Sequence, residues 1–156
     1  HMPPNFTKIL AQHLTKSAGL PADEAQDGEL LRAGHIYVAP GDYHMQVEEV
    51  DAAKKITLNQ GPPENYCRPA VNPMLRSVAE LYGSNVLVVI LTGMGYDGMK
   101  GGENIVAAGG TIIAQDEASS VVWGMPGAVA SAGLCTAVLP IDDIAPYVLE
   151  FMDKGM

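Results

Sequence analysis

Short apolar runs alternate with helical patterns in the second half of the chain, and this alternation constrains the fold most. The run from Val86 to Leu91 is apolar at every position, which is typical of a strand covered on both faces. Two more strand patterns and three helical patterns follow it, at residues 98–108, 111–114, 126–132, 135–139 and 142–152. Strands that alternate with helices form parallel βαβ units. We therefore predict an α/β fold with a doubly wound, mostly parallel sheet.

The first half of the chain combines helical patterns with half-polar strand patterns. Residues 7–17 and 72–81 show helical periodicity, and residues 35–39 read as a strand that ends at a Pro-Gly turn. Polar and apolar residues alternate over 43–49 and 55–58, on either side of a short loop. This alternation predicts an antiparallel hairpin, which we place at one edge of the sheet.

Composition limits the classes of function. The chain has 156 residues, which favours one domain, and its 47% hydrophobic content excludes wholesale disorder. A net charge of −9 argues against nucleic acid and against anionic membrane surfaces as partners. No apolar run reaches the ~18 residues that a membrane span needs. We expect no membrane insertion and no secretion signal, and hence a cytoplasmic protein.

Neither the cysteines nor the histidines suggest a metal site. Cys67 and Cys135 lie too far apart for a zinc spacing, and we interpret both as small buried residues in a reducing compartment. His13 is interpreted as a surface or satisfied histidine on a helix, and His35 and His44 have no third ligand at metal spacing. We predict no metal and no cofactor.

A glycine-rich loop follows the apolar strand and is the best-marked candidate for a site. Gly93-x-Gly95-x-x-Gly98 matches a dinucleotide-binding string, and Asp116 stands where a ribose-binding acid is expected. Against a Rossmann-like module, Asp97 adds a carboxylate to the loop that would hold pyrophosphate. The other interpretation is that Asp97 orients an imidazole while neighbouring amides face an oxyanion. The simpler alternative is that Asp97 only caps the next helix.

Five separated motifs place this loop in a larger pattern, and together they span nearly the whole chain. They are His1-Met2-Pro3-Pro4-Asn5-Phe6-Thr7, Ala39-Pro40-Gly41-Asp42-Tyr43-His44-Met45, Gly61-Pro62-Pro63-Glu64-Asn65 with Arg68-Pro69-Ala70-Val71, Leu91-Thr92-Gly93-Met94-Gly95-Tyr96-Asp97-Gly98, and residues 115–126 from Gln115 to Pro126. In this order the chain resembles the catalytic domain of the chemotaxis protein-glutamate methylesterases, the CheB-type family.

The resemblance implies an activity and a set of residues. Family members hydrolyse glutamate methyl esters on bacterial chemoreceptors, many also deamidate receptor glutamines, and a serine, a histidine and an aspartate do the chemistry. The histidine falls on His1, the aspartate on Asp97, and an oxyanion-site amide on Met94. The implied partners are methyl-accepting chemotaxis receptors, through their cytoplasmic helices, and the regulatory receiver domain of full-length relatives in two-component signalling. We expect His1 and Asp97 to share a proton bridge at one rim of the sheet.

The chain departs from the family pattern at the nucleophile. The family's serine lies in a glycine-rich turn upstream of the histidine, and no serine here occupies such a turn; the serines are Ser17, Ser77, Ser84, Ser119, Ser120 and Ser131. We therefore expect residues 1–156 to be a methylesterase catalytic domain without its first strand, first helix, nucleophile and receiver domain, and itself inactive. The loss of a central strand implies low stability or pairing with another chain.

Two further points stay open in the sequence. Ala70-Val71-Asn72 replaces the more usual Ser-Val-Asp of the family. The resemblance therefore says less about substrate contacts at these three residues. Met94, Met99 and Met125 either line a groove for a receptor helix or pack in the core. A non-catalytic fragment that binds receptors is the remaining alternative function.

Overall fold

The computed structural model describes residues 1–155, and they form two compact units, residues 1–77 and residues 78–155. Helix α2 (Val71–Tyr82) contributes residues to both units. It matches the helix expected over 72–81. None of the helices within residues 1–155 is long and apolar enough to cross a membrane.

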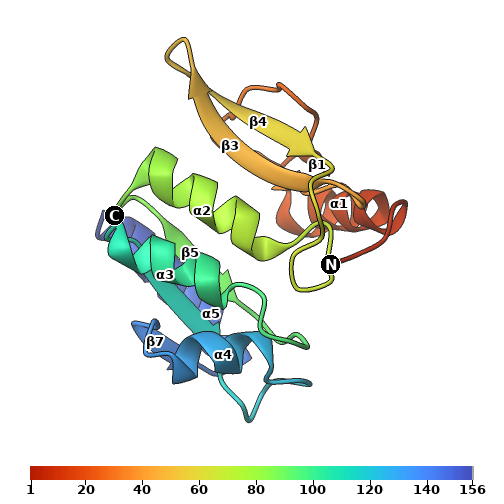
Figure 1. Cartoon of the computed structure of the whole chain (residues 1–156). Coiled ribbons are helices and arrows are strands. Elements are labelled where there is room, and N and C mark those ends of the chain that lie inside the picture. The colour runs from red at the N-terminus through yellow and green to blue at the C-terminus, as the bar shows by residue number, and fades with distance from the viewer. Residues whose placement is uncertain (156) are drawn as a thin grey trace. The chain divides into compact units, whose positions relative to one another are not determined.

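The first unit begins with a helix that packs on a pair of parallel strands (Figure 1). Helix α1 (Phe6–Ala18) contacts strands β1 (Ala22–Glu24) and β2 (Ile36–Val38), which pair in parallel with Asp23 opposite Tyr37. Helix α1 and strand β2 agree with the predicted elements. Strand β1 was not predicted, because Ala-Asp-Glu has no apolar alternation and becomes a strand only through its pairing with β2.

The expected antiparallel hairpin is present in the same unit. Strands β3 (His44–Val50) and β4 (Ala53–Asn59) pair over their whole length, and they form a two-stranded sheet of their own. Asp51 and Ala52 have φ angles of 53° and 62°, the left-handed pair that a two-residue type I′ turn requires. The inner face of the hairpin contributes Met45 and Ile56 to a buried cluster with Ala25.

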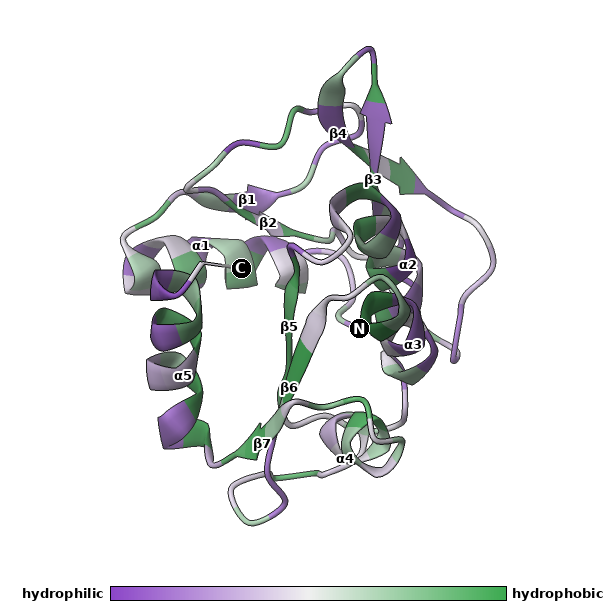
Figure 2. Ribbon diagram, turned by 90° about the vertical axis from the view of Figure 1, so that its left-hand side faces the viewer, coloured by the Kyte–Doolittle hydropathy of each residue, from purple (hydrophilic) through white to green (hydrophobic). Residues whose placement is uncertain are grey.

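The second unit is a layered α/β structure. Its strands β5 (Leu87–Ile90), β6 (Thr111–Gln115) and β7 (Ala137–Leu139) are all parallel, in the order β5-β6-β7. Figure 2 shows the helices α3 (Met99–Ala107) and α4 (Met125–Ser131) on one side of this sheet and α5 (Ile141–Asp153) on the other. Five side chains between these layers are at most 1% exposed, namely Ile105, Ile112, Ile113, Ala114 and Val129. The predicted α/β class is confirmed.

Candidate functional site

The loop after β5, residues 92–98, is fastened to the loop after β6, residues 116–124. The Thr92 hydroxyl donates to the Val122 carbonyl (3.0 Å) and accepts from the Val122 amide (2.9 Å). The Gly93 amide donates to the same Val122 carbonyl (3.0 Å), and the Gly93 carbonyl accepts from the Met125 amide (2.8 Å). Because both loops leave the carboxyl ends of parallel strands, they meet at the edge where ligands of such sheets bind.

Gln115 is the buried residue that joins the two loops. Its side chain is 2% exposed; Oε1 accepts from the Thr92 amide (2.8 Å), and Nε2 donates to the Ser119 carbonyl (2.8 Å). The Trp123 indole donates to the Gln115 carbonyl (2.9 Å). Sequence reasoning gave Gln115 no role. The available signal was an amide side chain at the end of a strand that is otherwise apolar and buried.

The two loops approach so closely that glycine is required at their contact. A Cβ on Gly124 would lie 2.7 Å from the Gly93 carbonyl oxygen and 2.8 Å from the Gly95 amide nitrogen. Gly95 itself has a φ of 89°, in the left-handed region that a side chain disfavours. The glycines of this loop therefore serve its close packing and its bend.

Asp97 is the buried carboxylate of this loop. It is 3% exposed, and its Oδ1 accepts from the Gly98 amide (3.1 Å). Helix α3 begins at Met99 with Gly98 as its N-cap, so the alternative in which Asp97 is the cap residue itself is not what the structure has. An ionised carboxylate is costly to bury unless charged or hydrogen-bonded partners compensate, which favours a role for Asp97 beyond the helix start.

Met94 lies on the outside of the same loop. Its side chain is 83% exposed, and its backbone amide has no hydrogen-bond acceptor within residues 1–155. A backbone amide without an acceptor in its own loop can donate to an anion. Met125 is half-buried, with its sulfur packed over Gly93, so it belongs to the core of the loop, whereas Met94 does not.

Asp116 and the two serines after it have structural partners. Asp116 Oδ1 accepts from both the amide (2.9 Å) and the hydroxyl (2.6 Å) of Ser119, and these bonds lower the pKa of the Asp116 carboxyl. Ser119 Oγ also accepts from the Ile141 amide (3.0 Å) at the start of α5, and Ser120 Oγ donates to the Asp116 carbonyl (2.6 Å). Asp116 therefore organises its own loop, which does not favour a ribose-binding role.

His1 lies in the first unit, at the rim of an apolar cavity. The residues that follow it are held by a turn: a Cβ on Gly41 would lie 2.3 Å from the Pro4 nitrogen, and the Gly41 amide donates to Thr7 Oγ1 (3.1 Å). The cavity has a volume of about 160 Å³, and His1 and Met2 line it together with residues of α1 and α2. The close packing of Gly41 on Pro4 places His1 at this rim.

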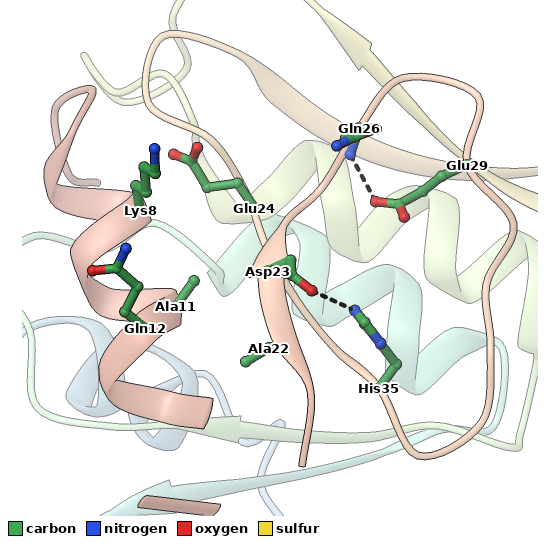
Figure 3. Close-up of a pocket in the computed structure, with 9 residues that line it drawn as sticks. All are labelled: Lys8, Ala11, Gln12, Ala22, Asp23, Glu24, Gln26, Glu29 and His35. Atoms are coloured by element: carbon green, nitrogen blue, oxygen red, sulfur yellow. Dashed lines mark hydrogen bonds and ion pairs between the residues drawn. The ribbon is translucent and has the colours of Figure 1, made fainter. Parts of the chain in front are cut away.

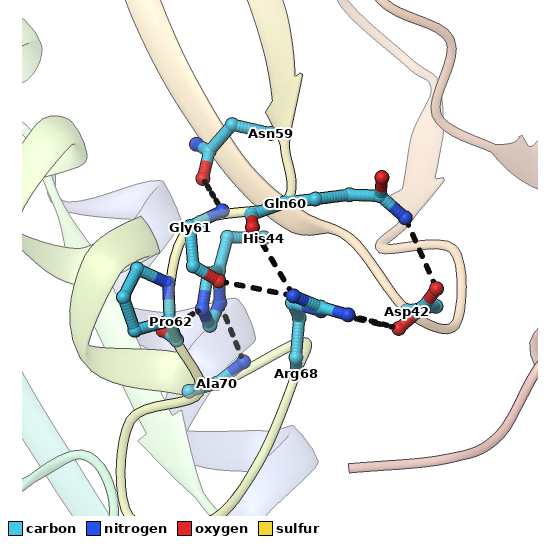
Figure 4. A network of polar contacts seen from close by, with 8 residues as sticks. All are labelled: Asp42, His44, Asn59, Gln60, Gly61, Pro62, Arg68 and Ala70. Atoms are coloured by element: carbon cyan, nitrogen blue, oxygen red, sulfur yellow. Dashed lines mark hydrogen bonds and ion pairs between the residues drawn. The ribbon is translucent and has the colours of Figure 1, made fainter.

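The other histidines have structural surroundings. His44 is 3% exposed; its Nδ1 accepts from the Ala70 amide (3.2 Å) and its Nε2 lies 2.9 Å from the Pro62 carbonyl, which it can reach as a donor. In Figure 4, the Arg68 guanidinium donates to the Asp42 carboxylate and to the Gly61 carbonyl, and so stabilises the segment of residues 61–70. His44 therefore organises the segment from residue 61 to residue 70.

His35 lines a larger and more polar cavity of about 550 Å³ (Figure 3). Its Nε2 lies 3.5 Å from Asp23 Oδ2, and the Gln26 amide donates to Glu29 in the same wall. His13 is exposed on α1. Within residues 1–155 no group of three His, Cys, Asp or Glu side chains is arranged to hold a metal ion.

The comparisons with known proteins decide the family. The CheB methylesterase family model matches residues 1–148. This chain belongs to the CheB methylesterase family. The crystal structure of the Thermotoga maritima CheB methylesterase catalytic domain superposes with a TM-score of 0.92 at 42% identity, covering 96% of this chain and 79% of that one. The resemblance and the fold drawn from the motifs are confirmed.

Two curated relatives carry the name protein-glutamate methylesterase/protein-glutamine glutaminase 1. The protein from Paramagnetospirillum magneticum is 63% identical over 150 residues, covering 96% of this chain and 39% of the relative. The protein from Rhodospirillum rubrum is 62% identical over 154 residues, covering 99% and 40%. The chain thus spans about two fifths of the length of the curated relatives it matches.

The predicted site residues of this CheB-family chain fall into two groups. Met94 and Asp97 lie on one loop of the second unit, and His1 lies in the first unit. Pairing of His1 with Asp97 belongs to the function proposed below.

Proposed function

We propose that this chain supplies the histidine and the aspartate of a Ser-His-Asp hydrolase that cleaves γ-methyl esters of glutamate in bacterial chemotaxis receptors. The same site would deamidate receptor glutamines, as the double name of the relatives suggests. The observation that carries the proposal is Asp97: a carboxylate only 3% exposed, on a loop whose first residue is held by Gln115, in a chain of the methylesterase family.

Each residue has a defined task in this reaction. The serine oxygen attacks the γ-carbonyl carbon while His1 takes the serine proton, and Asp97 orients the imidazole and stabilises its charged form. The Met94 amide donates to the oxyanion that develops. His1 then gives its proton to the departing methanol, and water hydrolyses the acyl-serine to glutamate by the reverse proton path.

The serine comes, in this proposal, from sequence N-terminal to His1. The serines within the chain support this, because those nearest the loop have structural bonds: Ser119 with Asp116 and α5, and Ser120 with the Asp116 carbonyl. Ser77 is buried, where it donates to the Met74 carbonyl and accepts from the Val47 amide. The partners proposed are the cytoplasmic helices of chemoreceptors and a regulatory receiver domain, which implies a cytoplasmic protein.

The test uses a polypeptide in which the chain follows the serine-bearing segment of the family, with methanol release from methylated receptors as the readout. Asp97→Asn lowers the rate by about 10⁴-fold, the loss expected when a triad carboxylate can no longer orient its histidine. His1→Ala has an effect of similar size. Asp142→Asn, on the exposed first turn of α5, is the matched control and keeps the rate.

Other outcomes of this experiment contradict the proposal. Full activity of Asp97→Asn would show that Asp97 is structural only. Binding of a receptor peptide without any methanol release, with the serine segment supplied, would favour a receptor-binding module. Saturable micromolar binding of NAD in equilibrium dialysis would favour the dinucleotide interpretation instead.

A further inference from the structure

Residues 64–67 form a tight hairpin turn with a tyrosine at its tip. Glu64 and Cys67 exchange two backbone hydrogen bonds of 3.0 Å. Asn65 and Tyr66, between them, have φ angles of 51° and 64°, the left-handed pair of a two-residue type I′ turn. Such turns prefer Asn followed by Gly, so Asn65 suits its position and Tyr66 does not.

The Tyr66 ring gives the fold nothing in return for this backbone strain. A left-handed backbone is costly for a residue with a Cβ, and only packing of the side chain could offset that cost within the fold. Tyr66 is 99% exposed, so its ring packs against no other part of residues 1–155. A glycine would make the turn at lower cost, and the presence of a tyrosine therefore points to a contact outside these residues.

Ion pairs hold the turn on both sides. Arg76 of α2 donates to both carboxylate oxygens of Glu64 (2.9 and 2.7 Å). Arg68, just after the turn, donates to the Asp42 carboxylate and to the Gly61 carbonyl (Figure 4). A partner that meets a ring on such a turn does not have to order the backbone first, which lowers the entropy cost of binding. Tyrosines in this setting are typical anchors of protein interfaces.

The segment that carries the turn is joined to the residues that follow His1. The Asp42 amide donates to the Arg68 carbonyl (3.2 Å). Gly41, next to Asp42, packs so closely on Pro4 that a Cβ there would lie 2.3 Å from the Pro4 nitrogen. Because His1 is the residue that the proposed reaction brings to the ester, the molecule that carries the ester comes to the unit that also holds the turn.

Resting on the proposed function, we propose that Tyr66 is a docking residue for the receptor, and that its ring packs on the receptor helix that carries the glutamyl ester. A helix presents side chains along its whole length, whereas a free glutamyl ester ends a few atoms from the reacting carbonyl. The ring therefore raises the affinity for receptors and not the affinity for small esters.

The test compares two substrates of the polypeptide that includes the serine-bearing segment: methylated receptors in membranes and N-acetylglutamate γ-methyl ester. Tyr66→Gly raises the ratio of the receptor KM to the small-ester KM about tenfold, the loss expected for an interface anchor, and leaves kcat for receptors in place. Tyr66→Phe keeps the ring and returns the ratio to within about twofold of the original. In urea, the unfolding midpoint of Tyr66→Gly shifts upward, because glycine relieves the backbone strain.

Ala52→Gly is the matched control. Ala52 is exposed and occupies the same second position of the β3–β4 turn, with a φ of 62°. The substitution relieves the same kind of strain and removes no ring, so the urea midpoint rises and the ratio of KM values stays. Equal changes of this ratio in Ala52→Gly and Tyr66→Gly would contradict a role for the ring.

Other outcomes also overturn the docking role. A lower urea midpoint for Tyr66→Gly in the longer polypeptide would mean that the ring packs on the preceding segment of the same chain. An unchanged receptor KM, with weaker binding of the isolated receiver domain, would assign the ring to the receiver domain instead.

The failures of the two proposals are distinguishable. If methanol is released from receptors and Tyr66→Gly leaves the receptor KM unchanged, the docking role is wrong and the methylesterase stands. If no methanol is released but sedimentation with receptor membranes shows binding that Tyr66→Gly weakens about tenfold, the function is wrong and the docking role stands.

Discussion

At the scale of single residues, Gln115 carries more of the site than its place in the sequence suggests. Replacing it by alanine removes a buried side chain and leaves the Thr92 amide and the Ser119 carbonyl without this partner. We expect Gln115→Ala to lower the free energy of unfolding by about 1–3 kcal/mol, the cost of leaving partly buried hydrogen-bonding groups unsatisfied. Urea denaturation measures the loss.

The matched control for this change is Gln26→Ala, because Gln26 is exposed and its backbone amide, which the substitution keeps, is the group that donates to Glu29. A change of under about 0.5 kcal/mol is expected there. Equal losses in the two variants would mean that the Gln115 side chain does not hold the loops together.

The Asp116 carboxyl has a pKa below its usual value because the Ser119 hydroxyl and amide donate to it. Its contribution to stability is therefore present above the pKa of the unfolded chain, near 4, and is lost as the pH falls through the lower folded value. Ser119→Ala removes one donor, so the pKa of Asp116 rises in an NMR titration. Ser120→Ala, which changes only a bond to the Asp116 carbonyl, leaves it unchanged.

At the scale of elements, the contact between the two loops depends on a missing side chain. Gly124→Ala places a Cβ against backbone atoms of Gly93 and Gly95, which cannot turn away as a flexible side chain would. We expect a loss of about 1–3 kcal/mol in stability and large shifts of the Thr92 and Gly93 amide signals.

Gly133→Ala is the control for Gly124→Ala, because it strains the backbone without bringing a Cβ close to other atoms. Gly133 has a φ of 71° but open space around its Cβ position, so alanine there strains the backbone without touching the loops. The Thr92 and Gly93 signals stay in place in that variant. If they move equally in both variants, the contact at Gly124 is not what sets the loop.

The elements themselves were predictable where the pattern is local. The helices α1, α2 and α5 and the hairpin β3–β4 follow from apolar periodicity and turn residues, and all were predicted within a few residues. Strand β1 was missed because its three residues show no pattern and depend on a partner 14 positions later in the register.

At the scale of the whole molecule, each parallel sheet has unpaired edges. Strand β5 is apolar throughout and pairs only with β6 among the described strands, so its other edge presents unpaired backbone groups. We expect a polypeptide with the serine-bearing segment to need more urea to unfold than the chain alone. Amide exchange in β5 slows by about tenfold or more in that polypeptide.

Sedimentation of the chain alone is the companion measurement. An unpaired apolar strand edge favours association, so the apparent mass rises with concentration, and it returns to the monomer value when the segment is supplied. A monomeric chain with the same unfolding midpoint and the same exchange as the longer polypeptide would contradict the proposal that the serine-bearing segment pairs with β5.

The sequence by itself determined every helix and strand except β1, the α/β class and the family, because periodicity, turn residues and motif order are properties of neighbouring positions. Only the tertiary structure decided that Gln115 joins the two loops, that both ring nitrogens of His44 lie against backbone groups, and that an apolar cavity borders His1. These contacts join residues far apart in the chain, and the cavity is bounded by several elements, so no local pattern encodes them. They exist only once folding has brought the elements together and burial has made each polar group find its partner.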